Sequence, residues 1–165
     1  MRRWVTVVAG LLIATSAVAA PRVYDTGSWA SLTKAHAGRA AIVHFWGTSC
    51  APCLTELPEW AKLARTYPSA RLIFVQADPM PSHEGTSVLR QAGLGRMESW
   101  VFAPAANQER LRFEADPRWR GELPKTVLIA PDGTTTPLRN GTDFARIRDW
   151  LERVSKASGV DHIRK

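Results

Sequence analysis

The feature that most constrains this chain is its pair of cysteines, Cys50 and Cys53, which are the only two it has. An apolar run over residues 40–43 precedes the pair, and a helical pattern over residues 54–64 follows it. A Cys-x-x-Cys pair at a turn from a strand into a helix is typical of redox dithiols, because the unpaired N–H groups of the helix stabilise a thiolate. The sequence therefore predicts a reactive dithiol where a strand ends and a helix begins.

The short spacing of the cysteines argues against a purely structural bridge. A disulfide between Cys50 and Cys53 closes a very small loop, so it restricts the unfolded chain little and stabilises the fold weakly. A metal pair is the other alternative, but structural zinc usually takes four ligands and the chain has no third cysteine. We expect no bound metal and no other cofactor, while a copper site formed by the two cysteines and a histidine stays open.

The first twenty residues have the pattern of a secretion signal. Arg2 and Arg3 precede an uncharged run of apolar and small residues, and residues 17–19 fit the small-x-small cleavage rule. We expect a signal peptide over residues 1–20 and one domain over residues 21–165, exported to the periplasm. An uncleaved membrane anchor is the alternative, although the run is short for a spanning helix.

The charge of the chain does not indicate a nucleic-acid partner. Lysine and arginine number 22 against 15 acidic residues, which gives a formal net charge of +7. The basic residues are scattered, without a block of like charge or a basic patch interleaved with aromatic residues. We therefore expect protein partners and no nucleic acid.

The apolar periodicity predicts alternating strands and helices. The expected strands are 22–27, 40–46, 71–76, 100–102, 126–130 and 135–138, and the expected helices are 29–36, 50–67, 83–92, 105–113 and 143–156. Pro58 lies inside the second helix, where we expect it to cause a kink. This order predicts an α/β fold with a central mixed sheet flanked by helices on both faces. The segment 95–122 carries no motif that explains it.

Several short motifs occur together in the order of a known family. They are Phe45-Trp46-x-x-x-Cys50-x-Pro52-Cys53, Glu56-x-Pro58, Leu123-Pro124-x-Thr126 and Pro131-Asp132-Gly133. The combination resembles the exported thiol–disulfide oxidoreductases of the TlpA/ResA type, and the resemblance covers essentially all of the chain after the leader. It implies a thioredoxin-like fold, with Pro124 as a cis-proline whose loop faces the dithiol and Leu123 presenting its backbone to substrate.

The chemistry that we expect follows from the two cysteines. Cys50 is the candidate nucleophile, since a thiolate at a helix N-terminus attacks a substrate disulfide. Cys53, one turn further in and more buried, then resolves the mixed disulfide and forms the redox-active Cys50–Cys53 bridge. Trp46 and Pro52 are expected to pack beside this site.

Two titratable residues are candidates for proton transfer. In cytoplasmic thioredoxins a buried aspartate that assists proton transfer occupies the position of His44. We hypothesise that His44, with an ordinary pKa near ~6.5, accepts the proton of Cys53; a buried, hydrogen-bonded core histidine is an equal alternative. By resemblance, Glu56 is expected to relay protons or tune the pKa of the dithiol, its alternative role being to stabilise the helix N-terminus.

The remaining aromatic and basic candidates are expected to be structural. Trp100 and Trp119 could line a substrate groove, but core packing is the better interpretation, and Lys125 is expected to be a solvated surface residue.

The resemblance implies a periplasmic enzyme that reduces disulfides of exported proteins or apocytochrome c, with a membrane thiol transporter as its electron donor. The alternatives are an oxidase that donates its disulfide to folding proteins and a non-enzymatic copper carrier. The Ala51-Pro52 pair between the cysteines favours the reducing direction, because strong oxidants lower the pKa of the nucleophile much further, often with a histidine there.

Overall fold

The computed structural model describes residues 20–139 and 141–157, so the expected signal peptide, apart from Ala20, and residues 158–165 lie outside it. In chain order the elements are β1 (Arg22–Tyr24), α1 (Ser28–Ala35), β2 (Ala41–Trp46), α2 (Ala51–Thr66), β3 (Arg71–Gln76), α3 (Ser82–Gln91), β4 (Glu98–Phe102), α4 (Gln108–Ala115), β5 (Lys125–Ile129), β6 (Thr135–Pro137) and α5 (Phe144–Ala157).

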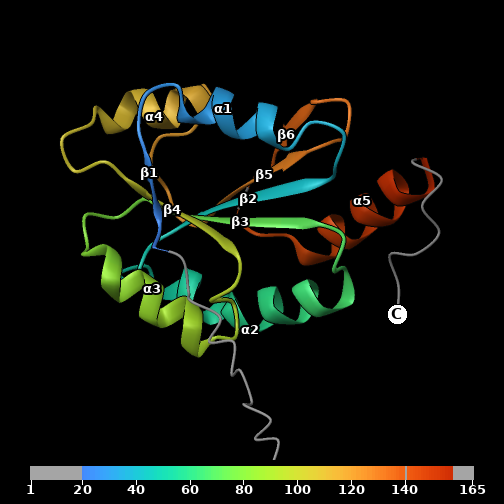
Figure 1. Cartoon of the computed structure of the whole chain (residues 1–165), viewed down its shortest axis with the longest axis horizontal. Coiled ribbons are helices and arrows are strands. Elements are labelled where there is room, and N and C mark those ends of the chain that lie inside the picture. Colours follow the sequence, from blue (N-terminus) through green and yellow to red (C-terminus); the bar gives the residue numbers. More distant parts are fainter. Residues whose placement is uncertain (1–19, 140, 158–165) are drawn as a thin grey trace, which may run out of the picture.

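The strands form one mixed sheet in the order β1-β4-β3-β2-β5-β6. Strands β1, β4, β3 and β2 run parallel to one another, while β5 is antiparallel to β2 and β6 is antiparallel to β5. Helices α1 and α4 cover one face of the sheet, and α2, α3 and α5 lie on the other (Figure 1). The predicted α/β fold with a mixed sheet between helical layers is confirmed.

Strand β2 is buried along its whole length, because both of its edges are paired and both of its faces are covered. Ala41, Val43 and Phe45 pack in the core on the α1 and α4 side. Ile42 and Trp46 pack in the core on the α2, α3 and α5 side. Double-sided burial accounts for the nearly continuous apolar run that the sequence shows here.

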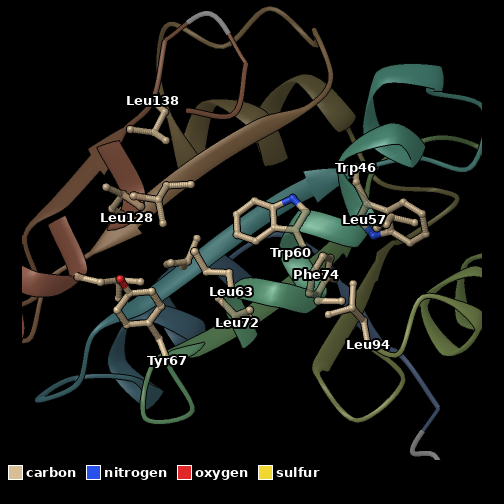
Figure 2. Packing of buried hydrophobic residues seen from close by; sticks show 14 of the residues in the cluster. Trp46, Leu57, Trp60, Leu63, Tyr67, Leu72, Phe74, Leu94, Leu128 and Leu138 are labelled. Atoms are coloured by element: carbon tan, nitrogen blue, oxygen red, sulfur yellow. The ribbon is translucent and has the colours of Figure 1, made fainter. Parts of the chain in front are cut away.

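The core on the α2 side is built around a fully buried tryptophan, Trp60. Its ring centroid lies 4.6 Å from that of His44 on β2, 6.0 Å from Phe74 on β3 and 5.0 Å from Phe144 on α5. Figure 2 shows Trp60 among the leucines of α2, β3 and β5. One side chain of α2 thus connects the helix that carries the cysteines to two strands and the last helix.

Helix α2 begins directly after Cys50, which serves as its N-cap residue. Pro52 lies in the first turn, where a residue without an N–H loses no hydrogen bond. The helix continues through Pro58 and ends at Thr66.

Two helix boundaries differ from the prediction for local reasons. Helix α1 already includes Ser28, because Gly27 takes the N-cap position with a φ of 81°, which glycine adopts without strain. Helix α4 begins three residues later than predicted, at Gln108, because the side chain of Asn107 caps it and accepts the Arg110 N–H at 3.1 Å.

The prediction that Lys125 is a solvated surface residue is wrong. The residue is only 6% exposed, and its Nζ donates to Asp116 Oδ2 at 2.7 Å and to the Leu138 carbonyl at 3.2 Å. Asp116 is also buried, at the C-terminal end of α4. The ion pair therefore joins the end of α4 to the start of β5. Trp100 and Trp119 are buried in the core, as predicted.

Removing one partner of this ion pair should destabilise the fold strongly. Burial alone would raise the pKa of Asp116, but the hydrogen bonds from Lys125 and Arg118 and the positive charges of both residues together hold the pKa below its usual range. The carboxylate is therefore charged at pH 7, and Asp116→Asn leaves a buried lysine without its counter-ion. We expect a loss of about 3 kcal/mol in the free energy of unfolding at pH 7, measured by urea denaturation.

The exposed Asp149 of α5 provides the control. Asp149→Asn should change the free energy of unfolding by less than about 0.5 kcal/mol. Equal stability of the Asp116→Asn variant and the unaltered protein would contradict a structural role for the pair.

Candidate redox site

The two cysteines lie between the end of β2 and the first turn of α2. They form a disulfide with an S–S distance of 2.07 Å and a Cα–Cα distance of 5.3 Å. Cys50 is half-buried, whereas Cys53 is fully buried in the core on the α2 side. Cys50 is therefore the more accessible of the two cysteines.

The helix N-terminus favours negative charge on Cys50. The Sγ atom of Cys50 accepts the backbone N–H of Cys53 at 3.3 Å. This donor and the positive end of the α2 dipole would stabilise a Cys50 thiolate in the reduced protein.

The loop carrying Pro124 opens at the same edge of the sheet. The Leu123–Pro124 peptide bond is cis. Strand β5 starts at the next residue, Lys125, which pairs with Phe45 near the end of β2. Pro124 is buried, and the half-buried Leu123 packs against both cores. The chain therefore enters β5 beside the place where it leaves β2 for the cysteines.

Contacts of Trp119, Asp116 and Lys125 hold the loop before Pro124. The indole N–H of Trp119 donates to the Glu122 carbonyl at 2.8 Å, and its ring lies 4.7 Å from that of Phe45. The Asp116–Lys125 ion pair closes the same segment from its other end. Part of the unexplained segment 95–122 thus fixes the approach to Pro124, and no sequence motif marks these contacts.

Trp46 and Pro52 have different environments. Trp46 is almost fully buried and lies in the same core as Cys53. Pro52 is exposed on the first turn of α2. Trp46 is therefore a core residue on the α2 side of the sheet, and Pro52 contributes to the start of the helix.

His44 is a fully buried core residue on the α2 side of the sheet. Its Nδ1 lies 3.1 Å from the hydroxyl oxygen of Thr126, the residue opposite it on β5. Its ring lies 4.6 Å from Trp60 and 5.7 Å from Phe74. Burial lowers the pKa of His44 to about 3. His44 is therefore neutral and a very weak base. This favours the role of a core histidine bonded to Thr126 over the role of proton acceptor for Cys53.

Glu56 is half-buried one turn beyond Cys53, and its pKa is raised above the ordinary value of a glutamate. Burial raises this pKa, and interactions with the side chains of Thr142 and Trp60 offset part of the rise. The hydroxyl of Thr142 lies 3.4 Å from that of Thr126. A row of polar groups therefore extends from Glu56 through the two threonines to His44. Glu56 is the member of this row whose pKa moves toward neutrality.

Two further properties concern only residues 20–139 and 141–157. Within these ranges no group of three or more histidine, cysteine, aspartate or glutamate side chains is arranged to hold a metal ion. No helix in this part of the chain is both long and apolar enough to cross a membrane.

Solved structures similar to this fold are thioredoxin-fold proteins. A secreted Mycobacterium tuberculosis disulfide oxidoreductase homologous to E. coli DsbE is 20% identical, with a TM-score of 0.56 over 74% of this chain and 85% of its own. A thioredoxin-related protein from Neisseria meningitidis serogroup B is 21% identical, with a TM-score of 0.58 over 82% and 98%. A thiol-disulfide isomerase from Corynebacterium glutamicum is 15% identical, with a TM-score of 0.60 over 73% and 83%. The sequence matches no protein-family model and no curated protein.

The mixed sheet, the helical layers and these likenesses define a thioredoxin-like fold. The disulfide at the N-terminus of α2 lies at the edge of the sheet where the Pro124 loop also opens. The thioredoxin-like fold predicted from the sequence is therefore confirmed.

The buried His44 should make stability depend on pH. Between pH 3 and the ordinary value of 6.5, the unfolded chain binds a proton at this position and the folded chain does not. His44 should therefore lower the free energy of unfolding by about 1.4 kcal/mol for each pH unit below pH 6. Urea denaturation of the unaltered protein and of His44→Gln at pH 7, 5.5 and 4.5 gives the free energy of unfolding as a function of pH. The difference between the slopes of the two proteins is the contribution of His44.

The exposed His83 serves as the control, and His83→Gln should keep the slope of the unaltered protein. Parallel pH profiles for His44→Gln and the unaltered protein would show that His44 is not held neutral by the fold.

Proposed function

We propose that this protein is an exported thiol–disulfide oxidoreductase that reduces disulfides of exported proteins through Cys50 and Cys53. The observation that carries this proposal is the disulfide at the N-terminus of α2, with Cys50 half-exposed at the sheet edge where the Pro124 loop opens. The disulfide oxidoreductase and thiol-disulfide isomerase among the similar structures support the same class of activity.

The reaction proceeds in two exchanges. The Cys50 thiolate attacks one sulfur of a substrate disulfide, forms a mixed disulfide and releases the other substrate sulfur as a thiolate. The Cys53 thiolate then attacks Cys50 Sγ, which releases the second substrate thiolate and forms the Cys50–Cys53 disulfide. Two electrons pass from the dithiol to the substrate. A membrane thiol transporter is the proposed donor that restores the dithiol.

The residues around the dithiol have separate proposed roles. Leu123 presents its backbone to the substrate, and Pro124 shapes the loop beside Cys50. Glu56 takes the proton of Cys53 as this thiol becomes a nucleophile, because its raised pKa makes it a better base than an ordinary glutamate. His44 keeps the Thr126 side of this row in place as a neutral core residue.

The proposed setting is the periplasm, with residues 1–20 as the signal peptide, and apocytochrome c is one candidate substrate. The TlpA/ResA-like motifs and the likeness to a secreted disulfide oxidoreductase from Mycobacterium tuberculosis support export. The Ala51-Pro52 pair supports the reducing direction over the oxidising one.

Insulin reduction tests the activity and its direction. The reduced protein should speed the precipitation of insulin chains in the presence of a dithiol, and Cys50→Ser should abolish this activity. The reduction potential should lie near about −270 mV, as in thioredoxin, whereas a value near about −120 mV would identify an oxidase. Absence of insulin reduction together with stoichiometric copper binding would favour the copper carrier instead.

Cys53→Ser should retain its substrates, because the mixed disulfide on Cys50 has no resolving thiol. Expression of this variant in the exporting cell, followed by nonreducing electrophoresis and mass spectrometry, would identify the trapped proteins. Apocytochrome c among them would support the maturation pathway, and secreted proteins with several structural disulfides in its place would contradict it.

The proton-transfer role predicts that Glu56→Gln slows the second exchange. Without the carboxylate, the lifetime of the mixed disulfide at pH 7 should increase by about tenfold to a hundredfold, because general-base assistance is lost. A single-turnover experiment with a labelled disulfide peptide measures this lifetime. Glu59→Gln, an exposed position one turn later in α2, is the matched control and should behave as the unaltered protein. Equal lifetimes for both variants would remove Glu56 from the mechanism.

A further inference from the structure

The segment between β2 and the nucleophile is held by a residue that the sequence motifs do not include. This residue is Asp78, two positions after the end of β3 and only 8% exposed. Its Oδ2 accepts the backbone N–H of Ser49 at 2.9 Å, the Ser49 hydroxyl at 2.9 Å and the Thr48 hydroxyl at 3.4 Å. Three donors from the two residues before Cys50 therefore converge on one carboxylate oxygen.

The other carboxylate oxygen of Asp78, Oδ1, is held by a residue at the end of β3. Gln76 donates from Nε2 to Asp78 Oδ1 at 3.0 Å and to the Met80 carbonyl at 2.9 Å. Gln76 is itself buried at the end of β3. The orientation of the carboxylate is thus set by β3, and the Thr48–Ser49 segment is attached to it.

The packing around this carboxylate requires glycine at position 47. A Cβ atom built on Gly47 would lie 2.6 Å from Asp78 Oδ2 and 2.8 Å from Asp78 Cβ, which is closer than such contacts occur. Gly85 makes similar room, because a Cβ there would collide with Gln76 Oε1. The backbone leaving β2 therefore lies directly against the Asp78 side chain.

Among the described residues, no basic side chain forms an ion pair with Asp78, and the ion pairs there involve other acidic residues. Burial alone would raise the pKa of Asp78, but the hydrogen bonds from Ser49, Gln76 and Thr48 outweigh it and hold this pKa below its usual range. A permanent charge is therefore bound to the residue next to Cys50.

We propose that Asp78 is a positioning residue for the dithiol, which holds the Gly47–Ser49 segment in place and keeps a negative charge bound to the residue that precedes Cys50. This inference rests on the proposed function and deepens it. A nearby anion opposes the stabilisation that the α2 N-terminus gives to the Cys50 thiolate. The charge of Asp78 therefore disfavours the reduced, thiolate form and makes the dithiol a better reductant.

The experiment compares three variants in the full chain. Asp78→Asn removes the charge and disturbs the hydrogen bonds. The double variant Thr48→Val/Ser49→Ala removes two hydroxyl donors and keeps the charge. Asp132→Asn is the control, since Asp132 is a turn carboxylate bound to the Thr134 N–H at 2.9 Å in the hairpin at the other end of β5. Circular dichroism and thermal unfolding establish that each variant is folded.

The first measurement is the pKa of Cys50 in the reduced protein, from thiolate absorbance. With Asp78→Asn it should fall by about half a unit to one unit, because one nearby negative charge is lost. With the double variant it should stay or rise, because the charge remains with fewer donors around it. Both variants loosen the same segment, so a merely structural role would shift the pKa in the same direction in both. That result, or an unchanged pKa in Asp78→Asn, would overturn the proposal.

The second measurement is the equilibrium with glutathione, in which the disulfide and two glutathione molecules give the dithiol and oxidised glutathione. Asp78→Asn should shift this equilibrium several-fold toward the reduced protein, and Asp132→Asn should leave it unchanged. An unchanged equilibrium in folded Asp78→Asn would also contradict the role of the charge. Neither measurement uses a protein substrate, so failure of insulin reduction in the unaltered protein would reject the proposed function independently of this result.

Discussion

The pairing and burial of β2 is the constraint on which the rest of the structure depends. Hydrogen bonds to β3 and β5 occupy both edges of this strand, and helical layers cover both faces. Its alternate residues contribute to two separate cores, so a change of register by one residue would exchange the two sets. Because its end is fixed this firmly, the start of α2 is fixed with it. The N-terminus of α2 then provides the electrostatic field in which Cys50 reacts.

The sequence was sufficient to predict the features that depend on local patterns. The apolar run of β2, the cysteine pair and the period of α2 predicted the position of the dithiol. By resemblance, the motif around Pro124 predicted that the loop of this proline faces the dithiol. Boundaries were less accurate where a single residue decides them, as at Gly27 and Asn107, because a cap depends on one side chain and not on a period.

Contacts between distant polar residues could not be predicted in the same way. Lys125 looked like a surface residue because nothing in its neighbourhood shows that Asp116 turns back toward it. Asp78 belongs to none of the sequence motifs, although it binds Ser49, the residue before Cys50, which lies 29 positions away in the sequence. His44 was assigned an ordinary pKa, since burial among Trp60 and Phe74 is a property of the packed core. Each of these properties depends on residues that are distant in the sequence but close in the fold, and the hydrophobic periodicity of the sequence does not indicate such contacts.

The reversal of direction between β2 and β5 has a mechanical consequence for the site. Pro124 lies one residue before Lys125, which is in register with Phe45, so the ladder of β-sheet hydrogen bonds holds it almost directly. Cys50 lies five residues beyond Phe45, outside the sheet. The backbone between them is held by the Ala77 N–H on the Trp46 carbonyl at 2.8 Å, the Cys50 N–H on the Gly47 carbonyl at 3.3 Å and the Asp78 carboxylate on Ser49. The strand pairing of the sheet therefore holds the proline side of the site, whereas turn and side-chain hydrogen bonds hold the cysteine side. A substitution that removes these hydrogen bonds would move Cys50 relative to Pro124 without changing the pairing of β2 with β5.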